Sequence, residues 1–362
     1  MTGQITSRAR AMTSHLGKEG RVAAVLPVHN PRALLRAHGF LPVEVWGPPG
    51  HAITSGDVHL QVYTCSVVRH ALAFISDGGL LGRADCVVVP HACDSLQGLG
   101  SVLLDFTKPD LPVLPYYLPR GQRASDRRFL AAELRALAGR LAEISGETAS
   151  DEDLHAACDR EEEADAVLAK LLSRRAALEI DNRHFYELAR SREYLPAEAF
   201  IKQAETVLAA AGKDPGAPDL PVLLSGLMPE PMSILDALDA AGATVVADDL
   251  ACLGRRLYQP SQAKDPYLRM AEGLLSGAPD STRGVSIEAR AEHLIRLAKD
   301  RGARGLIFFL VKFCEPEQFY LPQLQKRFKG ENLRSMMVEV HIGETLPDQV
   351  ITRLEAFLET LT

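Results

Sequence analysis

The chain has 362 residues, of which 46% are hydrophobic and 24% are charged, and this composition is typical of a soluble, well-cored protein of two or three domains. Its 47 acidic and 40 basic residues give a net charge of −7, which argues against a protein built on nucleic-acid contact because no general basic face is available. No run approaches the roughly 20 apolar residues of a membrane span. The N-terminal residues contain no apolar signal-peptide core, so we expect a cytoplasmic protein.

The first third of the chain alternates between strand and helix patterns. Apolar runs typical of strands cover residues 21–27, 40–46, 84–90 and 111–117, and helical patterns cover residues 31–39, 66–79 and 94–106. Alternation of this kind indicates a parallel sheet with helices packed on it. We predict an N-terminal α/β domain over residues 1–123.

The character of the sequence changes after residue 123. Residues 124–146 carry apolar side chains at helical spacing, and a second helix begins after Ser150, which is followed by acidic residues typical of a first helical turn. A third helix, from residue 195, is predicted to end at Gly212. Residues 124–213 are therefore predicted to form a helical segment without strands.

A segment rich in Gly and Pro, residues 211–221, is predicted to be a linker. Beyond it, strand patterns cover residues 221–226, 243–248, 304–311 and 334–342, and helical patterns cover residues 231–242, 286–302, 317–328 and 346–361. We predict a second α/β domain over residues 214–362. The fold class is thus α/β, with two parallel-sheet domains and a helical segment between them.

Three of the six cysteines lie where an apolar run gives way to the predicted start of a helix. These are Cys65, Cys93 and Cys314. In open α/β sheets ligands bind at the rim where strand ends meet helix starts, and the helix dipole there favours a thiolate. Three thiolates on one rim would suit an iron–sulfur cluster with one open iron. The alternative, a small buried hydrophobic residue, is preferred for Cys86 and Cys158.

Several familiar motifs are absent from the sequence. It contains no GxGxxG, no GxxxxGK[ST], no GxSxG, no HExxH and no CxxC. The chain is therefore not expected to bind a dinucleotide or ATP through these loops, and zinc or ferredoxin-type sites within the single chain are unsupported.

Six motifs, taken in order, carry a resemblance to a known family. They are VLPVHNPRALLRAHGFLPVEVWG, TCSVVRHAL, VVPHACDSLQGL, PVLLSGLMPEP with LDAAGATVVADDL, LIFFLVKFCEPEQFYLPQLQKRF and the final HIGETLPDQVITRLEAFLETL. The Cys-Asp pair in VVPHACDSLQGL is the most specific of them. Over nearly its whole length, the chain resembles the subunits of 2-hydroxyacyl-CoA dehydratases and benzoyl-CoA reductases.

The resemblance implies two flavodoxin-like domains and one [4Fe-4S] cluster, whose three cysteine ligands would be Cys65, Cys93 and Cys314. It implies a fourth iron left for water, hydroxide or a substrate oxygen, and a related second subunit. It also implies a separate ATP-hydrolysing iron–sulfur activator that delivers single low-potential electrons to an acyl-CoA thioester. A ketyl radical formed in this way would expel the adjacent hydroxide, whereas electron entry into an aromatic ring would reduce the ring.

Other residues of these motifs have either a functional or a structural interpretation. His29 and His91 are candidate catalytic residues, and the alternative for each is a packed or solvent-facing histidine. For Cys252 a structural role is preferred over a role beside the cluster. Asp94 and Glu315 are expected to cap helices, and Asn30 lies where a substrate could enter. Arg69 and Arg120 could contact a CoA phosphate or face solvent. Tyr116 and Tyr117 are expected to pack in the core or at an interface.

The sequence also departs from the family pattern. NPRALLRAHG lacks the usual acidic residues, VWGPPGH follows the second strand, and no clear serine and glutamate stand where substrate-binding dehydratase subunits keep them. These departures favour the partner subunit or the reductase branch. Dehydration of a 2-hydroxyacyl-CoA and reduction of an aromatic acyl-CoA both stay open, as do a non-catalytic electron-relay subunit and a cluster-free α/β scaffold.

Overall fold

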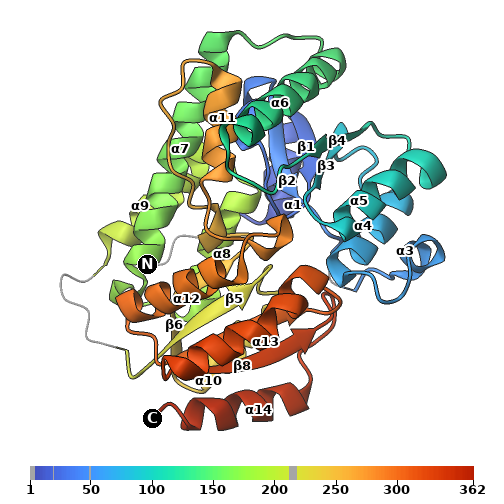
Figure 1. Ribbon diagram of the computed structural model, residues 1–362. Coiled ribbons are helices and arrows are strands. Elements are labelled where there is room, and N and C mark those ends of the chain that lie inside the picture. The colour runs from blue at the N-terminus through green and yellow to red at the C-terminus, as the bar shows by residue number, and fades with distance from the viewer. Residues whose placement is uncertain (1–4, 19, 49, 212–217) are drawn as a thin grey trace.

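The computed structural model describes residues 5–18, 20–48, 50–211 and 218–362. Two four-stranded sheets, both entirely parallel, organise these residues (Figure 1). The N-terminal sheet has the order β2-β1-β3-β4 and the C-terminal sheet the order β6-β5-β7-β8. The two orders are equivalent, and both match the first four strands of a flavodoxin-like sheet. The predicted fold class is confirmed.

All eight predicted strands are present. The strands of the N-terminal sheet are β1 (Arg21–Val25), β2 (Phe40–Glu44), β3 (Cys86–His91) and β4 (Val113–Tyr117), and those of the C-terminal sheet are β5 (Leu220–Gly226), β6 (Ala243–Leu250), β7 (Gly305–Val311) and β8 (Arg334–Val340). Every residue of β2, β5 and β7 is buried, because helices cover both faces of a parallel sheet.

The helices that accompany the N-terminal sheet are α1 (Arg8–Leu16), α2 (Arg32–Ala37), α3 (Thr54–His59), α4 (Ser66–Ser76) and α5 (Asp94–Val102), the last continued by a π-helical turn at Leu103–Thr107. Two of them, α1 and α3, were not predicted. The sequence of α3 has no apolar periodicity over its six residues, and short helices of this kind are held by packing rather than by their own pattern.

The helical segment contains α6 (Ala124–Ser145), α7 (Asp151–Ser173), α8 (Asn182–Arg190) and α9 (Ala197–Ala209). Ser150 is the N-cap of α7, and its side chain accepts a hydrogen bond from the amide of Asp153, as the acidic first turn predicted. The described part of α9 ends at Ala209, and the predicted stop at Gly212 lies outside the described residues. So does most of the predicted linker, together with the predicted boundary after residue 213.

The helices of the C-terminal part are α10 (Ser233–Ala240), α11 (Pro266–Leu275), α12 (Ile287–Arg301), α13 (Glu315–Gly330) and α14 (Asp348–Glu359). Short 3-10 turns lie at Arg175–Ala177, Ser191–Glu193, Gly254–Arg256 and Ser281–Arg283. The unpredicted α11 leaves its own sheet and packs on α6 and α7 (Figure 1). Its residues Met270 and Leu274 share a core with Val25 and Val88 of the N-terminal sheet.

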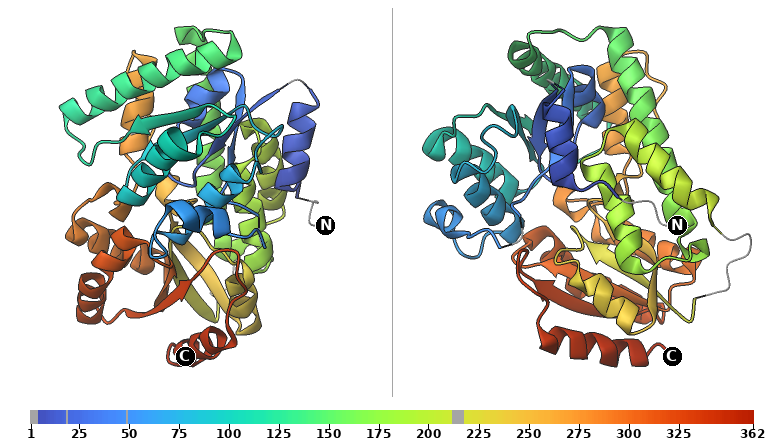
Figure 2. Two further views of the ribbon diagram at one scale, coloured as in Figure 1. Left: turned by 90° about the vertical axis from the view of Figure 1, so that its right-hand side faces the viewer. Right: turned by 180° about the vertical axis from the view of Figure 1, so that it is seen from behind.

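The carboxyl-terminal ends of the two sheets lie close to each other. Arg256, in the turn after β6, forms a buried ion pair with Glu44 at the end of β2. The amide of Ser66, at the start of α4, donates to the carbonyl of Lys312 after β7 at 3.2 Å. Both views in Figure 2 show the blue to teal N-terminal sheet and its helices above the yellow to red C-terminal sheet. Side chains at the ends of strands from both domains therefore share one region.

No helix in the described part of the chain is both long and apolar enough to cross a membrane.

Candidate functional site

Each of the three predicted site cysteines is the N-cap residue of a helix. Cys65 precedes α4, Cys93 precedes α5 and Cys314 precedes α13. Cys93 and Cys314 occupy equivalent positions, because each follows the third strand in chain order of its sheet, next to the point where the strand order reverses. Two of the three thiols therefore lie at the place where flavodoxin-like sheets bind their ligands.

Cys65 differs from the prediction in one respect. The apolar residues before it do not form a strand: residues 60–64 are a turn, in which Val62 is 62% exposed and Tyr63 is 56% exposed. These side chains face solvent and so lack the burial that holds a strand in a parallel sheet. The predicted helix start at Cys65 is confirmed, whereas the apolar run before it forms a solvent-facing turn and not a strand end.

Hydrogen bonds between the two domains hold Cys65 beside Cys314. Besides the bond from Ser66 to Lys312, the Oγ of Ser66 accepts a bond from the amide of Ile342, after β8, at 3.2 Å. Phe313 has a left-handed backbone with φ of 63°, and this turn leads the chain from the end of β7 into Cys314 and α13. The start of α4 is thus fastened to two loops of the C-terminal domain.

The three thiols influence one another. The Cys314 thiol forms a hydrogen bond with the Cys65 sulfur, which lowers the pKa of Cys65 and raises that of Cys314. Burial and, to a smaller extent, the proximity of Cys65 raise the pKa of Cys93 to about 12. Backbone amides of the first helical turns act in the opposite direction on Cys65 and Cys93, as expected at helix N-termini. All three cysteines are free thiols, and the structure brings them together.

The arrangement is not that of a single-ion site. In the described ranges no group of three or more His, Cys, Asp or Glu side chains has the geometry to hold one metal ion.

The other cysteines lie apart from this site. Cys86 and Cys158 are buried, and burial raises the pKa of each to about 12, which confirms the predicted packing role. Cys252 is also buried, and its charged neighbours are Glu193, Arg190 and other members of ion pairs rather than a site cysteine. The structure therefore gives Cys252 a place in the core between the domains.

His29 is buried between the two domains. Its Nε2 lies 3.2 Å from Thr282 Oγ1 and 3.5 Å from a carboxylate oxygen of Asp280, while its Nδ1 is buried with no hydrogen-bond partner. Burial lowers its pKa to about 4, although Asp280 opposes the shift, so the ring is neutral at pH 7. Its backbone φ of 52° is left-handed, and its carbonyl accepts a bond from Tyr116.

His91, two residues before Cys93, packs between Tyr117 and α5. Its ring packs edge-on against Tyr117, with 4.5 Å between ring centroids, and lies beneath Gly100, two turns into α5, where an added Cβ would meet Nε2 at 2.5 Å. Neither ring nitrogen has a hydrogen-bond partner.

The remaining predicted residues have mainly structural surroundings. Asn30 donates to Glu44 at 3.2 Å. Arg69 is 5% exposed and binds Asp57 at 2.6 Å, so it holds α3 against α4 rather than facing a ligand. Arg120, Asp94 and Glu315 are exposed. Tyr116 is buried, and Tyr117 is 48% exposed.

A cluster of buried charges behind Cys314 was not predicted. Arg255 binds Asp249 at 3.2 Å, Asp280 at 3.3 Å and Glu317 at 2.6 Å, and Arg290 binds Asp249 at 2.6 Å. A signal was nevertheless present, because Arg290 and Glu317 fall at core-facing positions of α12 and α13.

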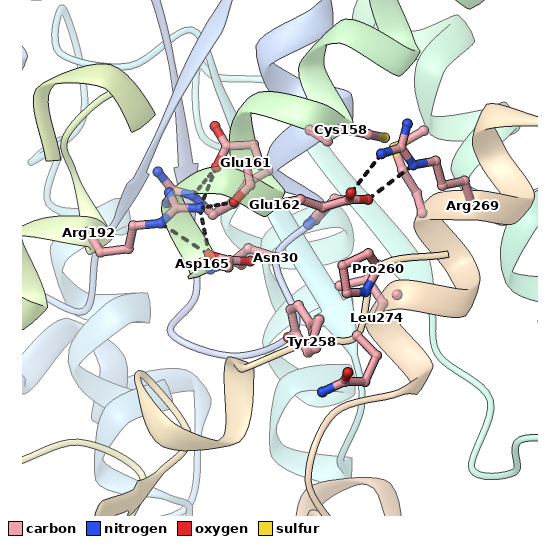
Figure 3. A pocket seen from close by; sticks show the side chains of 16 residues that line it. Asn30, Cys158, Glu161, Glu162, Asp165, Arg192, Tyr258, Pro260, Arg269 and Leu274 are labelled. Atoms are coloured by element: carbon pink, nitrogen blue, oxygen red, sulfur yellow. Dashed lines mark hydrogen bonds and ion pairs between the residues drawn. The ribbon is translucent and has the colours of Figure 1, made fainter. Parts of the chain in front are cut away.

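Two cavities lie elsewhere in the molecule. One, of about 90 Å³, is bordered by α7, α11 and the loop after β1. Figure 3 shows that the charges around it are already paired, Arg192 with Glu161 and Asp165, and Arg269 with Glu162. The other, of about 770 Å³, lies between α1, the loop after β2 and α8, and Trp46 lines it. None of the three site cysteines lines either cavity.

The fold defines a class of protein, with two parallel sheets of flavodoxin-like strand order, and three cysteines of the chain lie near one another between them. The family model described as 2-hydroxyglutaryl-CoA dehydratase, D-component, matches residues 27–361. The chain therefore belongs to this family, which confirms the resemblance found in the sequence.

Three relatives illustrate the range of the family. The chain is 25% identical to the lactoyl-CoA dehydratase subunit beta of Anaerotignum propionicum, over 97% of this chain and 95% of the relative. It is 26% identical to the (R)-2-hydroxyglutaryl-CoA dehydratase subunit beta of Acidaminococcus fermentans, over 99% and 97%. It is 26% identical to a benzoyl-CoA reductase subunit of Thauera aromatica, over 85% and 82%. Both the dehydratase and the reductase branch are thus represented among its relatives.

Proposed function

We propose that the chain is the iron–sulfur subunit of an acyl-CoA dehydratase or benzoyl-CoA reductase-type enzyme, and that Cys65, Cys93 and Cys314 hold a [4Fe-4S] cluster. The observation that carries the proposal is the convergence of three free thiols from two domains, each at a helix N-terminus. Helix N-termini stabilise the negative charge of thiolate ligands. The fourth iron would lack a protein ligand.

The residues present fit such a group. Cys65 and Cys314 are 5% and 4% exposed, so the site excludes most water, and thiolates are the ligands that iron–sulfur clusters prefer. When bound, the cluster supplies one-electron chemistry at low potential. The protein contributes the rigid placement of the thiols, through the bonds of Ser66 to Lys312 and Ile342.

His29 is the better supported of the two candidate acid–base residues. It lies in the loop after β1, and Asp280 and Thr282 lie on its Nε2 side, where they orient the ring and leave Nδ1 without a partner. His91 has no such orienting partner, and its ring lies against Gly100. We assign His29 a proton-transfer role at the interdomain site and give His91 a packing role.

The enzyme is proposed to work with protein partners in the cytoplasm. The relatives are named as subunits, so a related second subunit is the first partner. Large apolar side chains flank two of the cysteines: Val62 and Tyr63 precede Cys65, and Phe319, 72% exposed, follows Cys314 on α13. Exposed apolar groups of this size suit a protein interface. A separate ATP-hydrolysing iron–sulfur activator would supply the electrons, and six free thiols suit a reducing compartment.

A second candidate function is an electron-relay subunit whose partner binds the acyl-CoA. One observation favours it: neither of the two cavities described above is lined by a site cysteine. In this role the cluster would pass electrons without contacting the thioester.

The test is the content of iron and acid-labile sulfide in anaerobically purified protein, with EPR after reduction. We expect about four of each per chain. Cys93→Ser should lose most of the iron, whereas Cys252→Ser, which removes a buried thiol outside the site, should retain it. Full iron in Cys93→Ser would refute the ligand assignment. An EPR signal that an acyl-CoA perturbs supports substrate contact, and an unperturbed signal supports the relay function.

A further inference from the structure

The larger of the two cavities is a cleft to which both domains contribute and which the proposed cluster site does not use. Its volume is about 770 Å³, and α1, the loop after β2, α8 and the loop after β5 border it. Trp46 lines it, and none of the site cysteines does. Clefts of about 300–1,000 Å³ are typical of small-molecule sites. We call this one the Trp46 cleft.

The walls of the Trp46 cleft are mainly apolar and aromatic. α1 lines it with Met12 and Leu16, which lie one helical turn apart and are only half-buried. Other segments contribute further apolar residues, which are Val45, Trp46, Phe74, Leu80, Tyr194 and Met232. Aromatic rings pack well against another ring, and methionine side chains adapt to varied shapes. These walls therefore suit a ligand with an aromatic or branched apolar body.

The charged side chains that line the Trp46 cleft are paired, with one exception. The ion pairs are Arg190–Glu230 at 2.6 Å, Arg8–Glu193 at 2.5 Å and Glu187–Arg183 at 3.0 Å. Arg8 and Arg190 also lie over the Trp46 ring, with their guanidinium carbons 4.3 and 5.2 Å from its centroid. Arg83 lines the cleft as well, is exposed, and forms no ion pair with any residue that the structure describes. The cleft therefore combines apolar walls with a single unmatched positive charge.

We propose that the Trp46 cleft is a binding site for a small monocarboxylate with an aromatic or branched apolar body, whose carboxylate pairs with Arg83. A guanidinium matches a carboxylate with two parallel hydrogen bonds, and an apolar body gains free energy by leaving water for the walls. One unmatched positive charge suits one carboxylate better than a phosphate ester, which carries about two negative charges. Because the walls come from both domains, the ligand stabilises their association.

The single tryptophan of the chain makes the cleft its own reporter. The test titrates the full chain, including residues 1–4, with hydrocinnamate, a phenyl ring on a short carboxylate, and follows Trp46 emission and the melting temperature. We expect a saturable change in emission with one site per chain, and a higher melting temperature. Hydrocinnamyl alcohol, which has the same apolar body without the charge, should bind about fivefold more weakly.

Substitutions at the exposed rim of the cleft separate charge from packing. Arg83→Gln should weaken hydrocinnamate about fivefold and leave the affinity for the alcohol unchanged, and Arg83→Lys should restore part of the loss. Thr13→Glu places a carboxylate at the cleft wall and should also weaken hydrocinnamate. Ser14→Glu is the matched control, because Ser14 is the next exposed residue of α1 and does not line the cleft; it should bind like the wild type.

The proposal is overturned if millimolar hydrocinnamate gives no saturable change in Trp46 emission, if the alcohol binds as tightly as the carboxylate, or if Arg83→Gln keeps the wild-type affinity. This inference does not depend on the proposed cluster. A chain that holds no iron but binds hydrocinnamate through Arg83 would refute the proposed function and leave the monocarboxylate site standing.

Discussion

The ion pair between Glu44 and Arg256 offers a test of how the two domains are held together. Both oxygens of Glu44 are bound by the guanidinium of Arg256, and the side chains are 0% and 12% exposed. Arg256→Met preserves most of the volume but leaves a buried carboxylate whose remaining hydrogen bond comes from Asn30. Removing one partner of a buried pair costs about 3–5 kcal/mol, and we expect a loss of that size.

The loss should depend on pH. Burial raises the pKa of Glu44 in the folded protein, Arg256 opposes that shift, and Glu193 adds to it, so removal of Arg256 raises the pKa further. A carboxyl whose folded pKa lies above its unfolded value destabilises the fold at high pH, and this effect fades as the pH falls through the folded pKa. The cost of Arg256→Met should therefore be smaller at pH 5 than at pH 8.

The assay is urea unfolding followed both by circular dichroism and by tryptophan fluorescence. The chain has a single tryptophan, Trp46, which is buried two residues after Glu44, so its emission reports on this junction. The double variant Glu44→Gln, Arg256→Met should recover much of the loss because no unpaired charge is left. A cost below about 1 kcal/mol, a cost independent of pH, or no recovery in the double variant would refute the reasoning.

Two more predictions concern packing and acid stability. Gly56→Ala places a Cβ 2.4 Å from the carbonyl oxygen of Arg69 and should destabilise the protein by about 1–3 kcal/mol. Gly139 lies inside α6, and an added Cβ there meets nothing within 4 Å, so Gly139→Ala should stabilise the protein by about 0.5–1 kcal/mol. Equal changes in the free energy of unfolding for the two variants, measured in urea, would contradict the reasoning. In the folded protein burial alone would raise the pKa of Glu161, but Arg192 and a second arginine outweigh it and lower this pKa from 4.5 to about 2. The carboxylate therefore contributes about 3 kcal/mol above pH 4.5 that is lost as the pH falls toward 2. Glu161→Gln should reduce the loss of unfolding free energy between pH 4.5 and pH 2 by this amount. An unchanged loss would show that the ion pair of Glu161 with Arg192 does not stabilise the fold.

Much of the fold was predictable because the local patterns are strong. The run Gly305–Val311 is apolar throughout, as a strand buried on both faces must be. The side chain of Ser150 accepts a hydrogen bond from the amide of Asp153 in the helix that it caps, so this signal is also local. α3 and α11 were missed for opposite reasons. The first is too short for a periodic pattern, and the second has its apolar face buried against the core of the other domain, a partner that no local window contains.

The candidate site, like the fold, was predictable from the sequence only in part. The sequence alone determined that Cys93 and Cys314 follow strands and begin helices, because strand and helix signals are local and adjacent there. Only the tertiary structure decided that Cys65, which follows a turn, joins them, since its position depends on bonds from Ser66 to loops about 246 and 276 residues away. It also decided that Arg255, Arg290 and Glu317 are buried together. Charged residues are usually exposed, and their burial becomes tolerable only when partners distant in the sequence neutralise one another.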